Sequence, residues 1–128
     1  MSALNISFVC YLAFRYRNLL HLLEEHIYGN DREIIPHVLM YDYCVFVCEK
    51  IKTEGWVSSF LLTLEDNFEL EGEDEISNLI AVSFLEGIPY SIEIDKFLSK
   101  KLGPKTVQHY NIVVEPYRNA GYREQSIT

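Results

Sequence analysis

The sequence predicts an all-α fold: a single-domain bundle of about five to six helices spanning residues 1–128. Two observations lead to this prediction. Apolar residues recur at intervals of three and four along successive segments, which is the spacing of one face of an α-helix. Glycine or proline separates most of these segments, as expected where one helix ends and another begins. A chain of 128 residues also suits one domain with one core.

The first part of the chain contains two predicted helices. The first is amphipathic, with arginine and glutamate falling between its apolar positions. Pro36 favours the first turn of the second helix, because the first turn leaves its amide hydrogens without partners in any case. The expected bounds are Asn5 to about Tyr28 for the first helix and Pro36 to Glu54 for the second, with Gly29 and Gly55 as the stops.

The middle of the chain contains a third and a fourth predicted helix. The third is expected from Trp56 to Leu70 and is broken by Gly72. Asp74 is suited to cap the fourth, since a carboxylate accepts hydrogen bonds from the free amides of a first turn. The fourth helix is apolar nearly all round from residue 76 to residue 85, so we expect it to be the buried central helix.

The last part of the chain is less regular. A fifth helix is expected from Ser91 to Leu102, with its lysines facing outward. The segment Lys105–Glu115 is rich in β-branched residues, so a strand is one alternative, but a short final helix fits the preceding helices better. A loose polar tail is expected from about residue 117.

Charge is distributed unevenly along this acidic chain. The formal net charge is −8, which argues against nucleic acid as a partner, because lysine and arginine supply most of the affinity for phosphate backbones. Residues 53–95 contain 11 of the 19 acidic residues and no lysine or arginine. A field of one sign mainly speeds the capture of an oppositely charged partner.

The cysteines and the N-terminus predict the compartment. Three cysteines, Cys10, Cys44 and Cys48, show no secreted-scaffold spacing, which favours a reducing environment. The apolar run near the N-terminus lacks the basic start and cleavage site of a signal peptide, and it is too short to span a bilayer. We therefore expect a cytoplasmic protein that does not associate with a membrane.

The most distinctive stretch is the acidic run from Glu65 to Glu75. Seven of its eleven residues are acidic, and the next ten residues carry no charge. Unpaired charges stay at the surface and apolar runs are buried, so we expect an acidic surface edge that leads directly into a core helix. A solvated surface and a partner-binding surface are both compatible with such a run.

Two blocks of the sequence together resemble a known group of proteins. They are LLEEHIYGNDREIIPHVLMYDY, from Leu22 to Tyr43, and EISNLIAVSFLEGIP, from Glu75 to Pro89. Their pattern of helices resembles the small acidic immunity proteins that bacteria encode with polymorphic and contact-dependent growth-inhibition toxins. The resemblance implies a cytoplasmic protein that binds one cognate toxin domain and blocks it. It implies no particular contact residue.

Other chemistry is less well supported by the sequence. His37, Cys44 and Cys48 could share a helix face as metal ligands, but a structural zinc site needs a fourth ligand, and packing as core residues is the simpler interpretation. No cysteine has a base beside it in a catalytic pattern. The EGEDE segment lacks the ligand order of a calcium loop. We therefore expect no enzyme activity and no cofactor.

These observations predict a stoichiometric inhibitor whose acidic edge docks on a basic toxin domain, an RNase or a DNase. An intracellular helical adaptor that binds a non-toxin partner is the alternative. Aromatic residues beside the edge are expected to serve as anchors that become buried in the complex. Charge mainly speeds association and sets the orientation of the partners, whereas buried aromatic side chains slow dissociation. The expected partner-binding residues are Glu65, Asp66, Glu69, Glu71, Glu73, Asp74 and Glu75, with Trp56, Phe68 and Tyr90 as the anchors.

Overall fold

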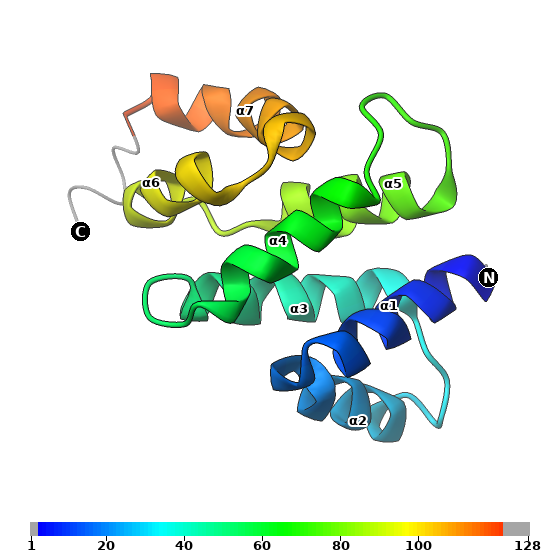
Figure 1. The fold of residues 1–128 in the computed structure, drawn as a ribbon. Coiled ribbons are helices and arrows are strands. Elements are labelled where there is room, and N and C mark those ends of the chain that lie inside the picture. The colour runs from blue at the N-terminus through cyan, green and yellow to red at the C-terminus, as the bar shows by residue number, and fades with distance from the viewer. Residues whose placement is uncertain (1–2, 122–128) are drawn as a thin grey trace.

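The computed structural model describes residues 3–121, which form seven α-helices and no strand (Figure 1). The all-α prediction is confirmed, with more helices than the five to six expected. Three short segments connect or extend them: a 3₁₀ turn at Arg17–Leu19, a π-helical turn at Ile80–Phe84 and a 3₁₀ turn at Leu85–Gly87. The helices are α1 (Ala3–Arg15), α2 (Leu20–Gly29), α3 (Pro36–Lys50), α4 (Trp56–Asp66), α5 (Glu75–Leu79), α6 (Ile92–Lys101) and α7 (Pro104–Asn119).

Helix α3 runs through the middle of the molecule. Figure 1 shows α1 and α2 on one side of it and α6 and α7 on the other, while α4 crosses in front. The π-helical turn packs on α3, and both α1 and α2 also contact α3. One core cluster joins side chains from all these elements. Its largest fully buried aromatic residues are Tyr43, Phe60, Phe68, Phe84 and Tyr110.

The single helix expected from Asn5 to about Tyr28 is divided in two. Tyr16 leaves the helical region, with φ −121° and ψ 86°. Its buried hydroxyl donates a hydrogen bond to the Ser59 carbonyl at 2.8 Å and lies 2.5 Å from Thr63 Oγ1, both on α4. A contact between distant segments therefore outweighs the local helical spacing, and the prediction of one helix is wrong here.

The next two helices begin as expected and end earlier. Helix α3 begins at Pro36 and stops at Lys50 rather than Glu54, and α4 begins at Trp56 and stops at Asp66 rather than Leu70. Beyond α4, the Asn67 side chain donates to the Thr63 carbonyl at 2.8 Å, which satisfies a carbonyl group of the last turn. The chain then turns so that Phe68 enters the core, where it is 2% exposed.

The predicted fourth helix is irregular. Asp74 begins it as expected, but regular α-helix covers only five residues before the π-helical turn. Side chains of α3 contact this turn: Cys44 Sγ donates to the Phe84 carbonyl at 3.2 Å, and His37 Nδ1 lies 2.5 Å from Ser83 Oγ. The segment is also not buried all round, because Val82 is 48% exposed.

The last part of the chain is helical where a strand was one alternative. Helix α7 runs from Pro104 through Pro116 to Asn119, so residues 117–119 of the expected loose tail are helical. The ring of Tyr117 stacks on Tyr90 with centroids 3.5 Å apart, and Arg118 binds Asp95 at 2.7 Å. The rest of the predicted tail, 122–128, lies outside the described residues.

Candidate functional site

Glu65 belongs to the fold's interior rather than to an acidic edge. It lies in the last turn of α4 and is 7% exposed. Its carboxylate accepts hydrogen bonds from the backbone amides of Lys105 at 3.0 Å and Thr106 at 2.8 Å, and from the Thr106 hydroxyl at 2.8 Å. It therefore caps α7, whose own N-cap residue, Gly103, has no side chain. The expectation that Glu65 lies on an exposed acidic edge is wrong.

The cap also lowers the pKa of Glu65 and favours glycine at position 103. Burial raises the pKa of Glu65, but hydrogen bonds from Thr106 and Lys105 outweigh burial and hold the pKa below its ordinary value. A Cβ atom at Gly103 would overlap the Glu65 side chain. Glycine is therefore the residue that lets this carboxylate reach the first turn of α7.

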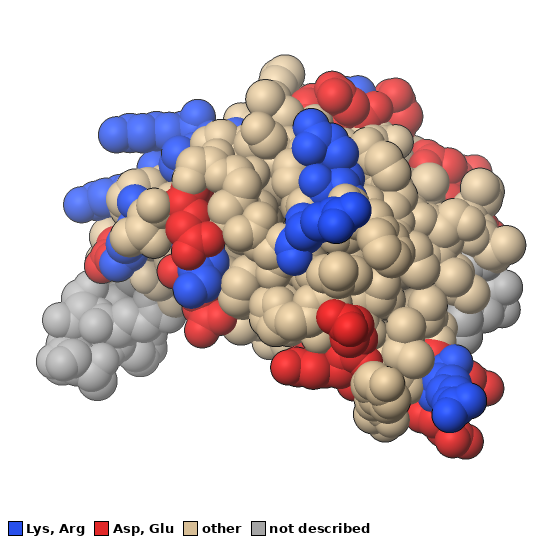
Figure 2. All heavy atoms as spheres, turned by 60° about the horizontal axis from the view of Figure 1, so that its bottom comes forward, with Lys and Arg blue, Asp and Glu red and all other residues tan. Residues whose placement is uncertain are grey.

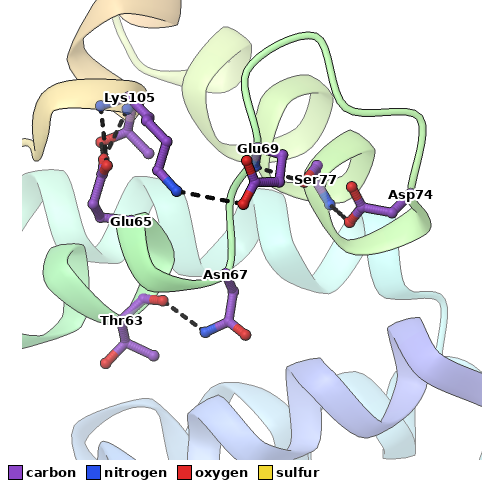
Figure 3. Close-up of polar contacts among 8 residues, drawn as sticks. Thr63, Glu65, Asn67, Glu69, Asp74, Ser77 and Lys105 are labelled. Atoms are coloured by element: carbon purple, nitrogen blue, oxygen red, sulfur yellow. Dashed lines mark hydrogen bonds and ion pairs between the residues drawn. The ribbon is translucent and has the colours of Figure 1, made fainter.

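The loop between α4 and α5 is held at its ends by Ser77. The Ser77 hydroxyl accepts a hydrogen bond from the Glu69 amide at 2.9 Å, and the Ser77 amide donates to Asp74 Oδ2 at 2.9 Å (Figure 3). The hydrogen bond from the Ser77 amide is the main cause of the lowered pKa of Asp74, as expected for a helix cap. Gly72 allows the tight turn between them, because a Cβ there would lie 2.8 Å from Asp74 Oδ1.

The other carboxylates of the acidic run are exposed on or beside this loop. They are Asp66, Glu69, Glu71, Glu73 and Glu75. Figure 3 shows the Lys105 side chain reaching from α7 toward Glu69, and the two charged groups are 3.6 Å apart. Such an exposed ion pair is weak, so Glu69 can exchange it for a partner's cation.

A groove of about 470 Å³ lies beside the loop. Its walls are residues 68–72, the segment from α5 through the π-helical turn, and the middle of α7. His109 Nε2 lies 3.0 Å from the Glu86 carboxylate at the groove, and the rings of His109 and Phe68 pack edge to face. Val82 and Ile112, which are 48% and 67% exposed, supply apolar surface from different walls.

Searches of the chain against family models, curated proteins and solved structures found no match. None of the helices in residues 3–121 is long and apolar enough to cross a bilayer. The function therefore has to be argued from the geometry of the groove and the loop.

The three predicted aromatic anchors do not gather at this groove. Phe68 lines it but is 2% exposed, so its ring packs in this protein's own core rather than projecting from the surface. Trp56 packs against Phe46 and Phe60 and donates its indole N–H to Glu54 at 2.6 Å. Tyr90 is half-buried under Tyr117.

No local pattern in the sequence marks the exposed apolar residues that line the groove. Val82 lies in a run that is otherwise mostly buried, and Ile112 lies in a segment whose β-branched residues are compatible with strand as well as helix. The available signal was the helical register of α7. It places Gln108, His109 and Ile112 within one turn of each other, but it requires knowing that 104–119 is a helix.

Negative charge is not confined to the loop. On the side of the molecule drawn in Figure 2, carboxylates form several separate groups, some of them beside basic side chains. The simple picture of a single acidic rim is therefore wrong. The feature particular to the loop is that its carboxylates adjoin a groove with apolar walls.

Of the residues considered for metal or nucleophilic chemistry, Cys44 and Cys48 belong to the core, whereas His37 is exposed and Cys10 is partly buried. In residues 3–121, no three His, Cys, Asp or Glu side chains are arranged to hold a metal ion. Cys44 and Cys48 are buried, and burial raises the pKa of the Cys44 thiol, which keeps it neutral. Burial likewise raises the pKa of Cys10.

Proposed function

We propose that this protein is an immunity protein that binds a basic bacterial nuclease toxin and blocks its active-site surface. The observation that carries the proposal is the juxtaposition of carboxylates and apolar surface at one groove. Glu69, Glu71 and Glu86 line it together with Val82 and Ile112. A partner bound there would meet charges that speed association and an apolar surface that slows dissociation.

The charge of the loop favours a nuclease as the partner. Nucleases bind phosphate groups with lysine and arginine, so their active-site surfaces are basic. Exposed carboxylates on a loop that Ser77 anchors at both ends can take the place of phosphate groups and complement such a surface. The net charge of −8 adds long-range attraction to a cationic partner.

Binding to the toxin domain encoded beside this gene tests the proposal. We expect a 1:1 complex by calorimetry and a loss of nuclease activity at equimolar inhibitor. The triple variant Glu69→Lys/Glu71→Lys/Glu73→Lys should bind at least about tenfold more weakly, with a smaller dependence on salt. Asp74 is left unchanged because its substitution would disturb the start of α5.

A matched control makes the same charge change elsewhere. Glu24, Glu25 and Glu33 are exposed, and they lie on α2 or just after it, away from α5 and α7 in Figure 1. Their reversal to lysine should reduce the association rate modestly and leave the dissociation rate unchanged. Equal losses in both triple variants would contradict docking at the loop. Binding without inhibition of the nuclease would instead indicate an adaptor.

A further inference from the structure

Helix α1 has an uncharged outward side. No residue from Ala3 to Phe14 is charged, and the inward residues of the helix, such as Leu12, are buried. The outward side includes Tyr11 at 50% and Phe14 at 57% exposure, with Ser7 also exposed. A surface helix ordinarily places charged side chains outward, so this composition is typical of a helix covered on both sides.

The charge distribution of the chain favours a second copy of the protein as the partner that covers the outward side of α1. Two molecules with a net charge of −8 repel each other, so they associate most readily through a surface without carboxylates. The first 23 residues contain no acidic residue, and their only charges are Arg15 and Arg17. Figure 2 turns the side that carries α1 and α2 forward and shows a basic group surrounded by uncharged surface.

The same side is a poor match for a flat anionic membrane. Figure 2 shows carboxylates at its margin, and Glu24 and Glu25 on the neighbouring α2 are exposed. A membrane would meet these acids together with the arginines, whereas a helix from a second copy contacts only a narrow stripe. The charges therefore favour a local contact between helices.

The spacing of the outward residues fits such a contact. Leu4, Ser7, Tyr11 and Phe14 follow intervals of three, four and three, which is the spacing of the seam between two packed helices. In an antiparallel pair with two-fold symmetry centred level with Val9, Ser7 of one copy faces Tyr11 of the other. The small serine leaves room for the large ring, so the surface is complementary to itself.

We propose that this protein self-associates through α1, as an antiparallel pair in which Ser7 faces Tyr11 of the second copy. The 13-residue helix is about 20 Å long, which is too short to bury the roughly 800 Å² per partner of a standard interface. The dimer is therefore weak and forms at micromolar or higher concentration. No residue of α1 lines the groove beside α7, so the pairing does not depend on the proposed inhibition.

Sedimentation equilibrium from about 10 μM to about 1 mM tests the pairing over the range expected for a weak contact. The average mass should rise from 15.0 kDa toward twice that value. Phe14→Glu should keep the mass at the monomer value throughout. Leu62→Glu, at a residue of α4 that is 55% exposed, is the control and should leave the rise unchanged. A wild-type protein that stays monomeric at every concentration would overturn the proposal.

Exchanging the small and large residues tests the register. Ser7→Tyr alone should reduce the fraction of dimer, because two large rings would then face each other. The double variant Ser7→Tyr/Tyr11→Ser should restore it. If Ser7→Tyr increased association, the cause would be general stickiness and the antiparallel pair would be wrong. A wild-type protein that stays monomeric yet sediments with phosphatidylserine vesicles would assign α1 to a lipid surface instead.

Discussion

The carboxylate of Glu65 caps the helix that begins near Thr106, which lies 41 residues further along the chain. Both the amide and the hydroxyl of Thr106 donate to Glu65 Oε1 at 2.8 Å. Helices α4 and α7 are thus joined by a buried charged group whose partners lie on a distant segment. An acidic residue that resembled a surface charge in the sequence is instead part of the framework that forms the groove.

Replacing Glu65 with glutamine should destabilise the fold at neutral pH. The variant keeps the shape of the side chain but loses the charge that strengthens the hydrogen bonds, so we expect the free energy of unfolding to fall by about 2 kcal/mol. Urea unfolding at pH 7 measures this. Glu73→Gln, at an exposed residue of the same acidic run, should change stability by less than about 0.5 kcal/mol.

The effect of Glu65 should also depend on pH. Its pKa in the folded protein is lower than the ordinary value of 4.5, so its contribution is fully present above that pH. The contribution is lost as the pH falls through the folded-state pKa, where the wild-type carboxylate becomes protonated. The stability difference between wild type and Glu65→Gln should therefore shrink on acidification below about pH 4.5. A difference that stayed constant down to pH 2 would contradict the charged cap.

Adding one methyl group at Gly103 should weaken the same contact. The backbone there, with φ −73° and ψ 173°, suits any residue, so the effect of Gly103→Ala comes from overlap with Glu65 alone. We expect a loss of about 1–3 kcal/mol in thermal or urea unfolding. Gly55→Ala is the matched control, since no atom lies within 4 Å of its added Cβ, and it should be close to neutral.

Removing the cap of α5 should loosen the acidic loop. Asp74→Ala leaves the Ser77 amide without its acceptor and should cost about 1 kcal/mol. Hydrogen exchange should speed up at the amides of residues 75–77 more than elsewhere. Glu73→Ala, one residue away and without a capping hydrogen bond, should alter neither quantity. Equal effects of the two substitutions would show that the cap is unimportant.

The apolar walls of the groove should contribute to partner binding without contributing much to folding. Val82→Ser and Ile112→Ser change residues that are about half exposed or more, so thermal stability should change little. Each should weaken binding of the toxin domain by roughly five- to tenfold, mainly through faster dissociation. Leu62→Ser removes a comparably exposed side chain outside the groove and should leave affinity unchanged.

The features that the sequence predicts correctly depend on neighbouring residues. Pro36 begins α3, and Asp74 caps α5, because a helix start is determined within one turn. The features that it misses depend on contacts between distant segments. Tyr16 interrupts the first helix to reach α4, and Cys44 contacts the irregular turn at Phe84.

The candidate site shows the same division. The carboxylates of Glu69, Glu71, Glu73 and Glu75 are exposed, as the acidic run predicts. Asp74 has the capping role expected from its position. Glu65 and Phe68 belong to the same run but are directed inward by α7 and the core. No periodicity within the run distinguishes these two, because their partners lie some 40 residues away.

The two hydrogen bonds of Ser77 have an evolutionary implication. They hold the backbone of the loop through a serine hydroxyl and a capping aspartate, so the exposed side chains at positions 69 and 73 contribute little to the conformation. Mutations at these positions can alter recognition while the scaffold stays intact. For the inhibitor proposed above, such a loop would allow recognition to follow changes in the toxin's surface through successive substitutions, without a new fold each time.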